Sequence, residues 1–210
     1  MKLTKNSKLL ISKPKRRDDI ENLATRMREQ LDIGEDVYYV NVLSILEFRL
    51  KDLFDDDITY SIPDEWTRAE EAYYDSDKNV ISIRADVYDR AVLGDGRARF
   101  TIMHEIAHYI LFKIWGNPEL MDISEIVRYS NATLHSMDTE WQANTFAGAF
   151  LCRNELVRFS EIEEIAELCG VSLSAAETAF SVSRKIKYKS MSQWIPSSDE
   201  DYSYFFSMLQ

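Results

Sequence analysis

An apolar run with helical spacing reads Phe100-Thr-Ile-Met-His104-Glu105-Ile-Ala-His108-Tyr109. On an α-helix, His104 and His108 project from one face about one turn apart, so both imidazoles can bind the same metal ion. Glu105 lies to one side, where a carboxylate can take a proton from a metal-bound water, the general-base role in zinc-dependent peptide hydrolysis. The chain has 3 histidines and two of them fall in this motif, which favours a metal site over the alternative of core histidines in an apolar helix.

A third metal ligand is expected from a helix that begins at Asp138 or Thr139. Two histidines leave a hydrolytic zinc site one ligand short, because such sites commonly keep three protein ligands and one open position. Glu140 is the leading candidate, since its helix can pack across the motif helix; the alternative is a solvated carboxylate at a helix start. Asn144 follows one turn later on the same face and can orient a ligand through a hydrogen bond.

The composition is typical of a soluble globular protein. The chain has 210 residues, 45% of them hydrophobic, which suits one compact domain, alone or with a small appendage. No window approaches the ~18 uninterrupted apolar residues of a membrane span, and the patch Leu9-Leu10-Ile11 is shorter than the ~7–15-residue core of a signal peptide. We therefore expect a cytoplasmic protein with no membrane partner. Cys152 and Cys169 lack C-x-x-C spacing and are expected to be reduced and packed in the core.

The net charge of −11 is unevenly distributed along the chain. The first 17 residues hold seven of the 25 Lys and Arg and no acid, so the remainder carries 18 basic against 36 acidic residues, a charge of −18. A body of that charge repels phosphate backbones, so its partners are expected to be proteins rather than nucleic acids. Residues 1–17 are expected to form a flexible, solvated basic arm, with a nucleic-acid contact as the alternative.

Helical spacing of apolar residues predicts most of the remaining elements. A first helix is expected over about residues 18–31 and a second helix after the cap Asn41. The motif helix is expected over about residues 97–114, preceded by a loop. Residues 117–137 mix helix and loop signals and predict no element.

The period of the apolar residues changes to two between residues 58 and 83, which predicts a small three-stranded antiparallel sheet. A strand over residues 58–62 precedes a hairpin of residues 72–74 and 80–83 around a turn. The last strand can pair with an extended substrate peptide if its edge is free beside the metal site, whereas a covered edge would prevent this. The residues of this possible substrate strand are Val80, Ile81, Ser82 and Ile83.

Residues 160–184 have the pattern of a helix-turn-helix, with Ser160 as the first cap and Gly170 at the turn. A DNA-recognition role is disfavoured, because the second helix begins Ser174-Ala-Ala-Glu-Thr-Ala and offers almost no donors to phosphates or base edges. A structural helical hairpin is the better interpretation on an acidic body. The aromatic and acidic tail after residue 190 either docks on the domain or contacts a partner.

The chain resembles the ImmA/IrrE-type metallopeptidases, a family built around an HExxH helix, over about residues 18–184. The stretches that carry the resemblance are Asp19-Ile-Glu-Asn-Leu-Ala, Val80-Ile-Ser-Ile, Arg97-Ala-Arg-Phe-Thr-Ile-Met-His-Glu-Ile-Ala-His-Tyr-Ile-Leu, Glu140-Trp-Gln-Ala-Asn-Thr-Phe-Ala with a following Leu151, and Ile165-Ala-Glu-Leu-Cys-Gly-Val-Ser. Two positions depart from the family pattern. Cys152-Arg153-Asn154 stands where the family usually has a proline, and Ala107 replaces the usual glycine before the second histidine. Neither departure removes a ligand or the base.

The resemblance implies a gluzincin-like site in which His104, His108 and Glu140 bind the metal and Glu105 acts as the base. It implies that the helical hairpin is part of the fold. In the family, such peptidases cut helix-turn-helix repressors and so derepress genes of mobile elements, phages among them, or of DNA-damage responses.

The sequence as a whole predicts an α+β fold that is mostly helical, with the three-stranded antiparallel sheet packed on the HExxH helix and a C-terminal helix-turn-helix-like hairpin. The expected divisions are a basic flexible arm over residues 1–17, a metallopeptidase domain over 18–152, a helix-turn-helix-like helical subdomain over 153–189 and an acidic aromatic tail over 190–210.

Three functions follow as hypotheses. The first is a cytoplasmic metal-dependent endopeptidase that cleaves a protein regulator, in particular a transcriptional repressor, with one divalent ion, Zn²⁺ first and Mn²⁺ or iron as alternatives. The second is a catalytically silent protein that keeps the metal fold and sequesters a repressor. The third is a DNA-binding regulator, which the acidic body disfavours. In an endopeptidase, His135, Tyr129 or Tyr109 can stabilise the transition state by donating to the oxyanion.

Overall fold

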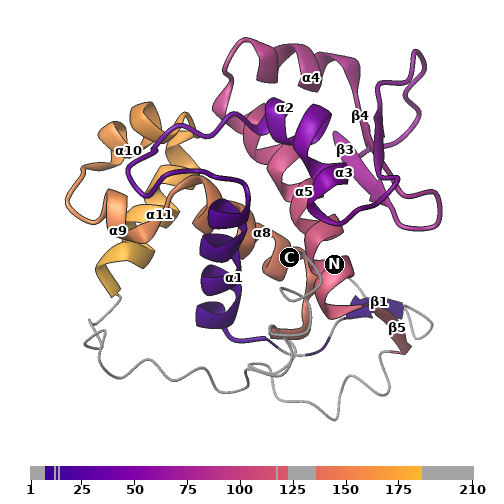
Figure 1. The fold of residues 1–210 in the computed structure, drawn as a ribbon, viewed down its shortest axis with the longest axis horizontal. Coiled ribbons are helices and arrows are strands. Elements are labelled where there is room, and N and C mark those ends of the chain that lie inside the picture. The colour runs from indigo at the N-terminus through magenta and orange to yellow at the C-terminus, as the bar shows by residue number, and fades with distance from the viewer. Residues whose placement is uncertain (1–7, 12, 14, 117, 123–135, 186–210) are drawn as a thin grey trace.

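The motif run forms α5, Gly96–Trp115, the long helix around which the other elements are arranged (Figure 1). Asp95 caps its N-terminus, where the side chain accepts a hydrogen bond of 2.8 Å from the Ala98 amide. Gly116 follows the last residue of the helix. The structure is a computed structural model, and it describes residues 8–11, 13, 15–116, 118–122 and 136–185.

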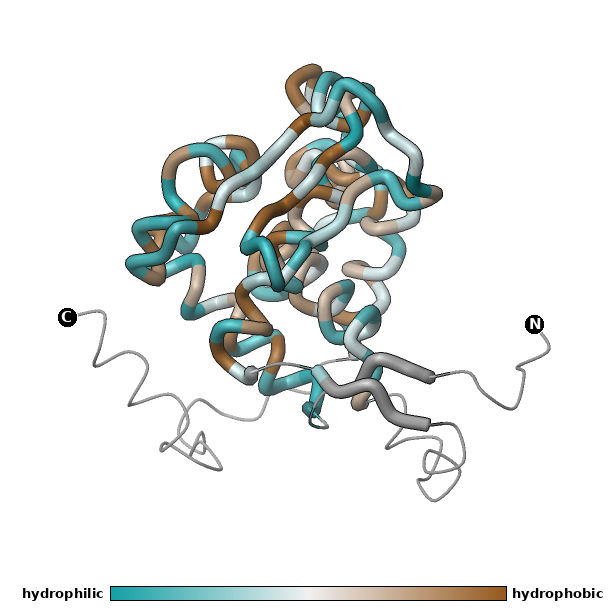
Figure 2. The backbone as a smooth tube through the Cα atoms, turned by 90° about the vertical axis from the view of Figure 1, so that its right-hand side faces the viewer, coloured by the Kyte–Doolittle hydropathy of each residue, from teal (hydrophilic) through white to brown (hydrophobic). Residues whose placement is uncertain are grey.

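Two helices far apart in the sequence pack with α5 to form the main core. α1, Arg17–Gln30, and α8, Thr139–Leu151, pack against each other, and α8 also packs along α5. Figure 2 shows hydrophobic and hydrophilic stretches alternating along the coiled parts of the backbone, as expected where one face of a helix is buried. Each fully buried aliphatic or phenyl side chain stabilises the fold by roughly 1.5–3 kcal/mol. The fully buried residues at the centre of this packing include Ile20, Leu23, Met27, Ile102, Ile106, Phe146 and Phe150.

A small mixed sheet covers another part of α5. Its strands are β2, Thr59–Ser61, β3, Ala72–Asp75, and β4, Val80–Ile83, in the order β2-β4-β3. β4 pairs antiparallel with β3, as the hairpin prediction required, but parallel with β2. The prediction of a purely antiparallel sheet is therefore wrong. The physical reason is the long connection over residues 62–71, which lets β3 lie at the outer edge while the apolar β4 takes the buried centre.

The first helical region after α1 is more irregular than its pattern predicted. Asn41 is the expected cap, because its side chain accepts a hydrogen bond of 3.0 Å from the Ser44 amide. The helix that follows consists of α2, Val42–Ser44, a π-helical turn η1, Ile45–Arg49, and α3, Leu50–Leu53. The region before α5, expected to be a loop, contains the helix α4, Ala85–Val92, which packs on α5.

A two-stranded ribbon was not expected from the sequence. β1, Lys8–Ile11, pairs antiparallel with β5, Glu119–Asp122. The prediction of a flexible arm over residues 1–17 is therefore wrong for these strand residues, and α1 already begins at Arg17. Local patterns could not show this pairing, because the two strands are separated by more than a hundred residues of sequence.

The C-terminal described region is the expected helical hairpin. After the short α9, Asn154–Val157, it consists of α10, Ile162–Cys169, and α11, Leu173–Lys185. Figure 1 shows these helices on one side of α8, away from the three-stranded sheet. The N-cap of α10 is Glu161 and not the expected Ser160. Glu161 forms a capping box, in which the Glu164 side chain accepts a hydrogen bond from the Glu161 amide.

The hairpin is tied to α5 by a buried arginine. Arg99 is 1% exposed and donates to the backbone carbonyls of Cys169, at 3.0 Å, Gly170 and, at 2.6 Å, Val40. Gly170 is left-handed at φ 59°, and a Cβ there would meet the Arg99 guanidinium, so both the backbone and the space require glycine. Cys152 and Cys169 are both free thiols and both buried, as predicted.

In the described part of the chain, no helix is by itself both long and apolar enough to cross a bilayer. Only α10 and α11 taken together reach that length and composition, and they are bent by 114° at their junction.

Candidate metal centre

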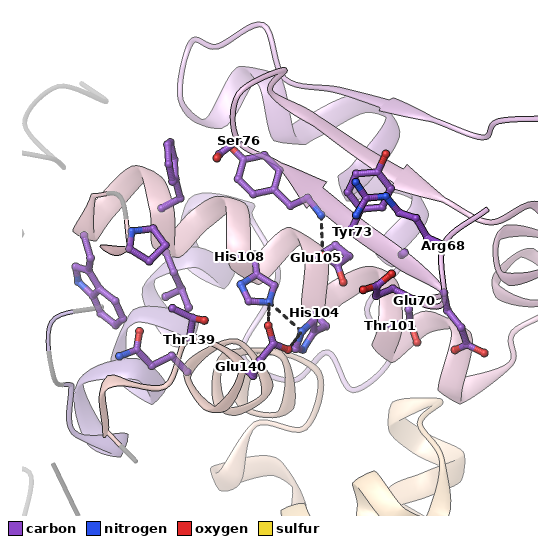
Figure 3. Close-up of a pocket in the computed structure, with 18 of the residues that line it drawn as sticks. Arg68, Glu70, Tyr73, Ser76, Thr101, His104, Glu105, His108, Thr139 and Glu140 are labelled. Carbon is purple, nitrogen blue, oxygen red and sulfur yellow. Dashed lines mark hydrogen bonds and ion pairs between the residues drawn. The ribbon is translucent and has the colours of Figure 1, made fainter. Parts of the chain in front are cut away.

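The three predicted ligands lie together between α5 and α8. His104 and His108 come from one face of α5, and Glu140 comes from the first turn of α8, as Figure 3 shows. The His104 Nε2 and His108 Nε2 atoms are 3.0 Å apart. The Glu140 carboxylate places one oxygen 3.2 Å from His104 Nε2 and the other 3.2 Å from His108 Nε2. All the donor atoms of this group lie within 4.8 Å of one another, so the three residues can hold one metal ion.

The spacing of these atoms fits a tetrahedral site. Two ligand atoms that each lie ~2.0–2.1 Å from a tetrahedral zinc are about 3.3 Å apart. The observed separations of 3.0 and 3.2 Å are close to this value. Two imidazole nitrogens and one carboxylate leave a coordination position for a reactant, which is typical of hydrolytic zinc sites, although the same ligand set also binds manganese or iron.

Local structure fixes the position and charge of Glu140. The Asp138 side chain caps α8 by accepting a 3.0 Å hydrogen bond from the Glu140 amide. Hydrogen bonds from His104 and His108 hold the pKa of the Glu140 carboxyl well below its ordinary value. The carboxylate is therefore ionised at neutral pH, as a metal ligand must be.

Asn144 supports the first histidine. Its Oδ1 lies 3.0 Å from His104 Nδ1, one helical turn after Glu140 on α8. With Oδ1 as the acceptor, Nδ1 donates to this bond, so Nε2 is the nitrogen left to face Glu140 and to bind a metal ion once it has given up its proton. Burial, the largest single influence, acts to lower the pKa of His104, but the hydrogen bond with Glu140 and the nearby carboxylate charges together raise that pKa above its ordinary value.

Glu105 lies beside the ligands but is directed at the sheet. It is 8% exposed, and its Oε2 accepts a hydrogen bond of 2.8 Å from the Tyr74 amide on β3. Burial raises the pKa of Glu105 above its ordinary value, against the opposing effect of the two nearby histidines. A carboxylate of raised pKa beside a metal site accepts a proton near neutral pH more readily than an exposed one.

The strand at the edge of the site is β3, not the strand expected to take a substrate. β4, with Val80, Ile81, Ser82 and Ile83, is central and paired on both sides, so its backbone is not available to a peptide. In β3, the Tyr74 amide points outward to Glu105, and backbone direction alternates along a strand. The Ala72 backbone therefore points outward as well. The outer edge of β3, which pairs with no other strand in the described part of the chain, faces the candidate metal centre.

The metal centre opens into a cleft of about 510 Å³ between β3, α5 and α8. Figure 3 shows Arg68, Glu70 and Tyr73 on the sheet side and Thr139 on the side of α8. The volume lies within the range of about 300–1,000 Å³ that is usual for ligand-binding clefts.

Among the other predicted site residues, Tyr109 is described and does not join this group. Tyr129 and His135 lie outside the described residues. Tyr109 is fully buried and its hydroxyl donates to Asp56 Oδ2 at 3.1 Å, so the suggestion that it stabilises an oxyanion is wrong. Burial also raises the pKa of Tyr109 above its ordinary range. It is a core residue because the face of α5 opposite the histidines packs inward.

Two residues of the site had no signal in the sequence. The Tyr74 amide orients Glu105, and a backbone group carries no mark of this in the side-chain pattern. Gln142 lines the cleft and its Nε2 donates to the carbonyls of Lys13, at 3.2 Å, and Ser136, at 2.8 Å, which ties the start of α8 to the N-terminal segment. The contacts of Tyr74 with Glu105 and of Gln142 with Lys13 join residues far apart in the sequence, so only the folded chain shows them.

Comparisons with protein-family models and with curated proteins give no match for this chain. Among solved structures, it is similar to a Mycobacterium tuberculosis transcriptional regulator, with a TM-score of 0.49 and 16% sequence identity over 76% of this chain. The matched region spans 45% of the length of that structure. The two chains share too little for the role of that protein to be transferred.

Proposed function

We propose that this protein is a metal-dependent endopeptidase of the ImmA/IrrE type that cleaves a protein regulator. The observation that carries the proposal is the grouping of His104, His108 and Glu140 at tetrahedral spacing, with the buried Glu105 beside them under a free strand edge. Zn²⁺ is the proposed ion, because two imidazoles and a carboxylate with an open position are a frequent hydrolytic zinc set.

A divalent metal held by these residues supplies Lewis-acid activation of a water molecule and of the peptide carbonyl. Glu105 accepts the proton of the attacking water and returns it to the leaving amine, so the carboxylate is regenerated at the end of the reaction. The Tyr74 amide fixes the Glu105 carboxylate through Oε2, and Asn144 fixes the His104 ring. Both contacts hold reacting or ligand groups in position before a substrate binds.

The free edge of β3 supports a substrate in extended form. The outward backbone groups of Ala72 and the carbonyl of Tyr74 can pair with a peptide strand and so lay it across the metal centre, while the Tyr74 amide holds Glu105. The resemblance to the ImmA/IrrE-type peptidases suggests a helix-turn-helix transcriptional repressor as the regulator, and the acidic body suits a basic protein. The proposal places the reaction in the cytoplasm, where such a repressor acts.

Co-expression with a helix-turn-helix repressor encoded beside this protein tests the proposal. The wild type is expected to remove the intact repressor, whereas Glu105→Gln, which keeps the ligands, is expected to leave it intact. If repressor function is relieved equally by both proteins while the repressor stays whole, the sequestration hypothesis replaces the peptidase. If neither protein affects any repressor, both hypotheses fail for that substrate class.

A further inference from the structure

A second pocket of about 480 Å³ adjoins the metal cleft. It lies between α5, α8, α11 and the start of α1, and it shares the lining residues Glu71, Arg97 and Thr101 with the metal cleft. Asn144 also lines it, and the same side chain contacts His104. The two pockets are therefore parts of one groove, with the metal centre in one part.

The groove follows one face of α8. Glu140, Asn144 and Gly148 are four residues apart in turn, so they lie in a row along that helix. Glu140 belongs to the metal cleft, while the other two line the second pocket. A bound peptide that extends from the metal centre along this face of α8 passes Asn144 and reaches the space above Gly148.

The second pocket is suited to an uncharged group. The four charged residues among its described lining residues form two pairs, Arg17 with Glu21 at 3.3 Å and Arg97 with Glu71 at 3.4 Å. A charged ligand group would have to compete with these pairs. The apolar side chains that line the pocket are Phe100, Trp141, Ala149, Ala175, Ala179 and Val182.

Gly148 keeps the floor of the pocket open. A glycine inside a helix costs roughly 0.5–1 kcal/mol relative to alanine. A Cβ at Gly148 would have no atom within 4 Å, and its φ is not positive, so neither close packing nor backbone conformation requires a glycine. The missing side chain leaves room in the second pocket, as expected for a position that makes space for a ligand.

We propose that the second pocket is a substrate subsite that takes one uncharged apolar side chain, aliphatic or aromatic, of the bound peptide. This inference rests on the proposed function. Gly148 is eight residues from Glu140, a rise of about 12 Å along the helix. Because an extended chain advances about 3.3 Å per residue, the apolar side chain lies within about four residues of the scissile bond.

A binding experiment tests the subsite without turnover. Full-length Glu105→Gln protein with added zinc is titrated with the capped peptides acetyl-Gly-Phe-Gly-amide, acetyl-Gly-Asp-Gly-amide and acetyl-Gly-Lys-Gly-amide, and NMR follows the backbone amides of Gly148, Phe100 and Thr178. Only the phenylalanine peptide is expected to shift these signals. Gly148→Leu, which fills the pocket, is expected to weaken its binding at least about tenfold relative to the matched control Gly148→Ala.

The inference is overturned if the phenylalanine peptide shifts none of these signals at about 10 mM, if the charged peptides bind equally well, or if Gly148→Leu binds like Gly148→Ala.

In a separate experiment, zinc-loaded wild type digests a degenerate peptide library and the products are sequenced. Apolar enrichment at one position, lost in Gly148→Leu, is expected. Binding at Gly148 with no cleavage of any peptide would leave the pocket supported as a binding site and count against the proposed function, so the two failures are distinguishable.

Discussion

Replacing Asn144 by alanine is expected to weaken zinc binding while the protein stays folded. The variant removes the acceptor 3.0 Å from His104 Nδ1 and leaves the three ligands in place. Loss of such a supporting partner typically costs 10–100-fold in metal affinity. Asn144 is exposed, so water replaces part of the lost interaction. We therefore expect the lower end of that range, about tenfold or about 1.4 kcal/mol.

The measurement is a competition for zinc between the purified protein and a chromophoric chelator at neutral pH. Asn144→Asp is the matched control, because it keeps an acceptor at the same place and is expected to bind zinc at least as tightly as the wild type. Glu140→Gln removes a ligand and is expected to lose more affinity than Asn144→Ala. Thermal unfolding of the metal-free variants shows whether the fold is intact.

The reasoning is refuted if Asn144→Ala and the wild type hold zinc equally well while Glu140→Gln loses it. That result would show that His104 is oriented by its helix alone. Equal zinc affinity in all three proteins would refute the ligand assignment itself.

Three further predictions concern stability. Burial acts to raise the pKa of Asp56, but hydrogen bonds, led by that from Lys113, lower it to about 2, so the stability it supplies is present above about pH 4 and is lost as pH falls toward 2. Unfolding followed between these pH values should show Asp56→Asn losing less stability on acidification than the wild type. Gly148→Ala is expected to raise the free energy of unfolding by roughly 0.5–1 kcal/mol, measured by denaturant titration. A lower free energy of unfolding than that of the wild type would contradict the open space around that position. Arg99→Met is expected to lower the free energy of unfolding by about 3 kcal/mol, because buried carbonyls of the hairpin turn and of Val40 lose their donor. A change below about 1 kcal/mol in the same titration would show that water replaces the guanidinium as the donor.

The elements that the sequence predicted well are those set by local spacing. α5 begins and ends within about two residues of its predicted bounds, and α8 begins at one of the two predicted residues, because caps such as Asp138 and apolar spacing act within one or two turns. The α+β, mostly helical class and the three-stranded sheet are confirmed. The same locality explains why His104, His108 and Glu140 could be proposed as one group: two of them share a helix face, and the third begins a helix with a buried, apolar character.

The errors arose where distant segments meet. The position of β4 between its neighbours depends on which strand is buried deepest in the finished fold, and no local pattern states that. For this reason the edge strand beside the candidate metal site is β3 and not β4, which had been the predicted substrate strand. The pairing of β1 with β5 and the contact of Gln142 with Lys13 likewise join segments far apart in the sequence. Tyr109 was misplaced because a neighbour of a ligand on a helix points about 100° away from it.

Sequencing the products of a purified reaction tests the proposed peptidase most directly. Zinc-loaded protein is incubated with a purified helix-turn-helix repressor, and the new N-termini are identified by mass spectrometry. We expect cleavage at a defined peptide bond that a chelator abolishes, that zinc restores and that Glu105→Gln lacks. Zinc-loaded wild type that leaves the repressor uncut, or Glu105→Gln that cuts at the same bond and rate, would contradict the role of Glu105 and the peptidase itself.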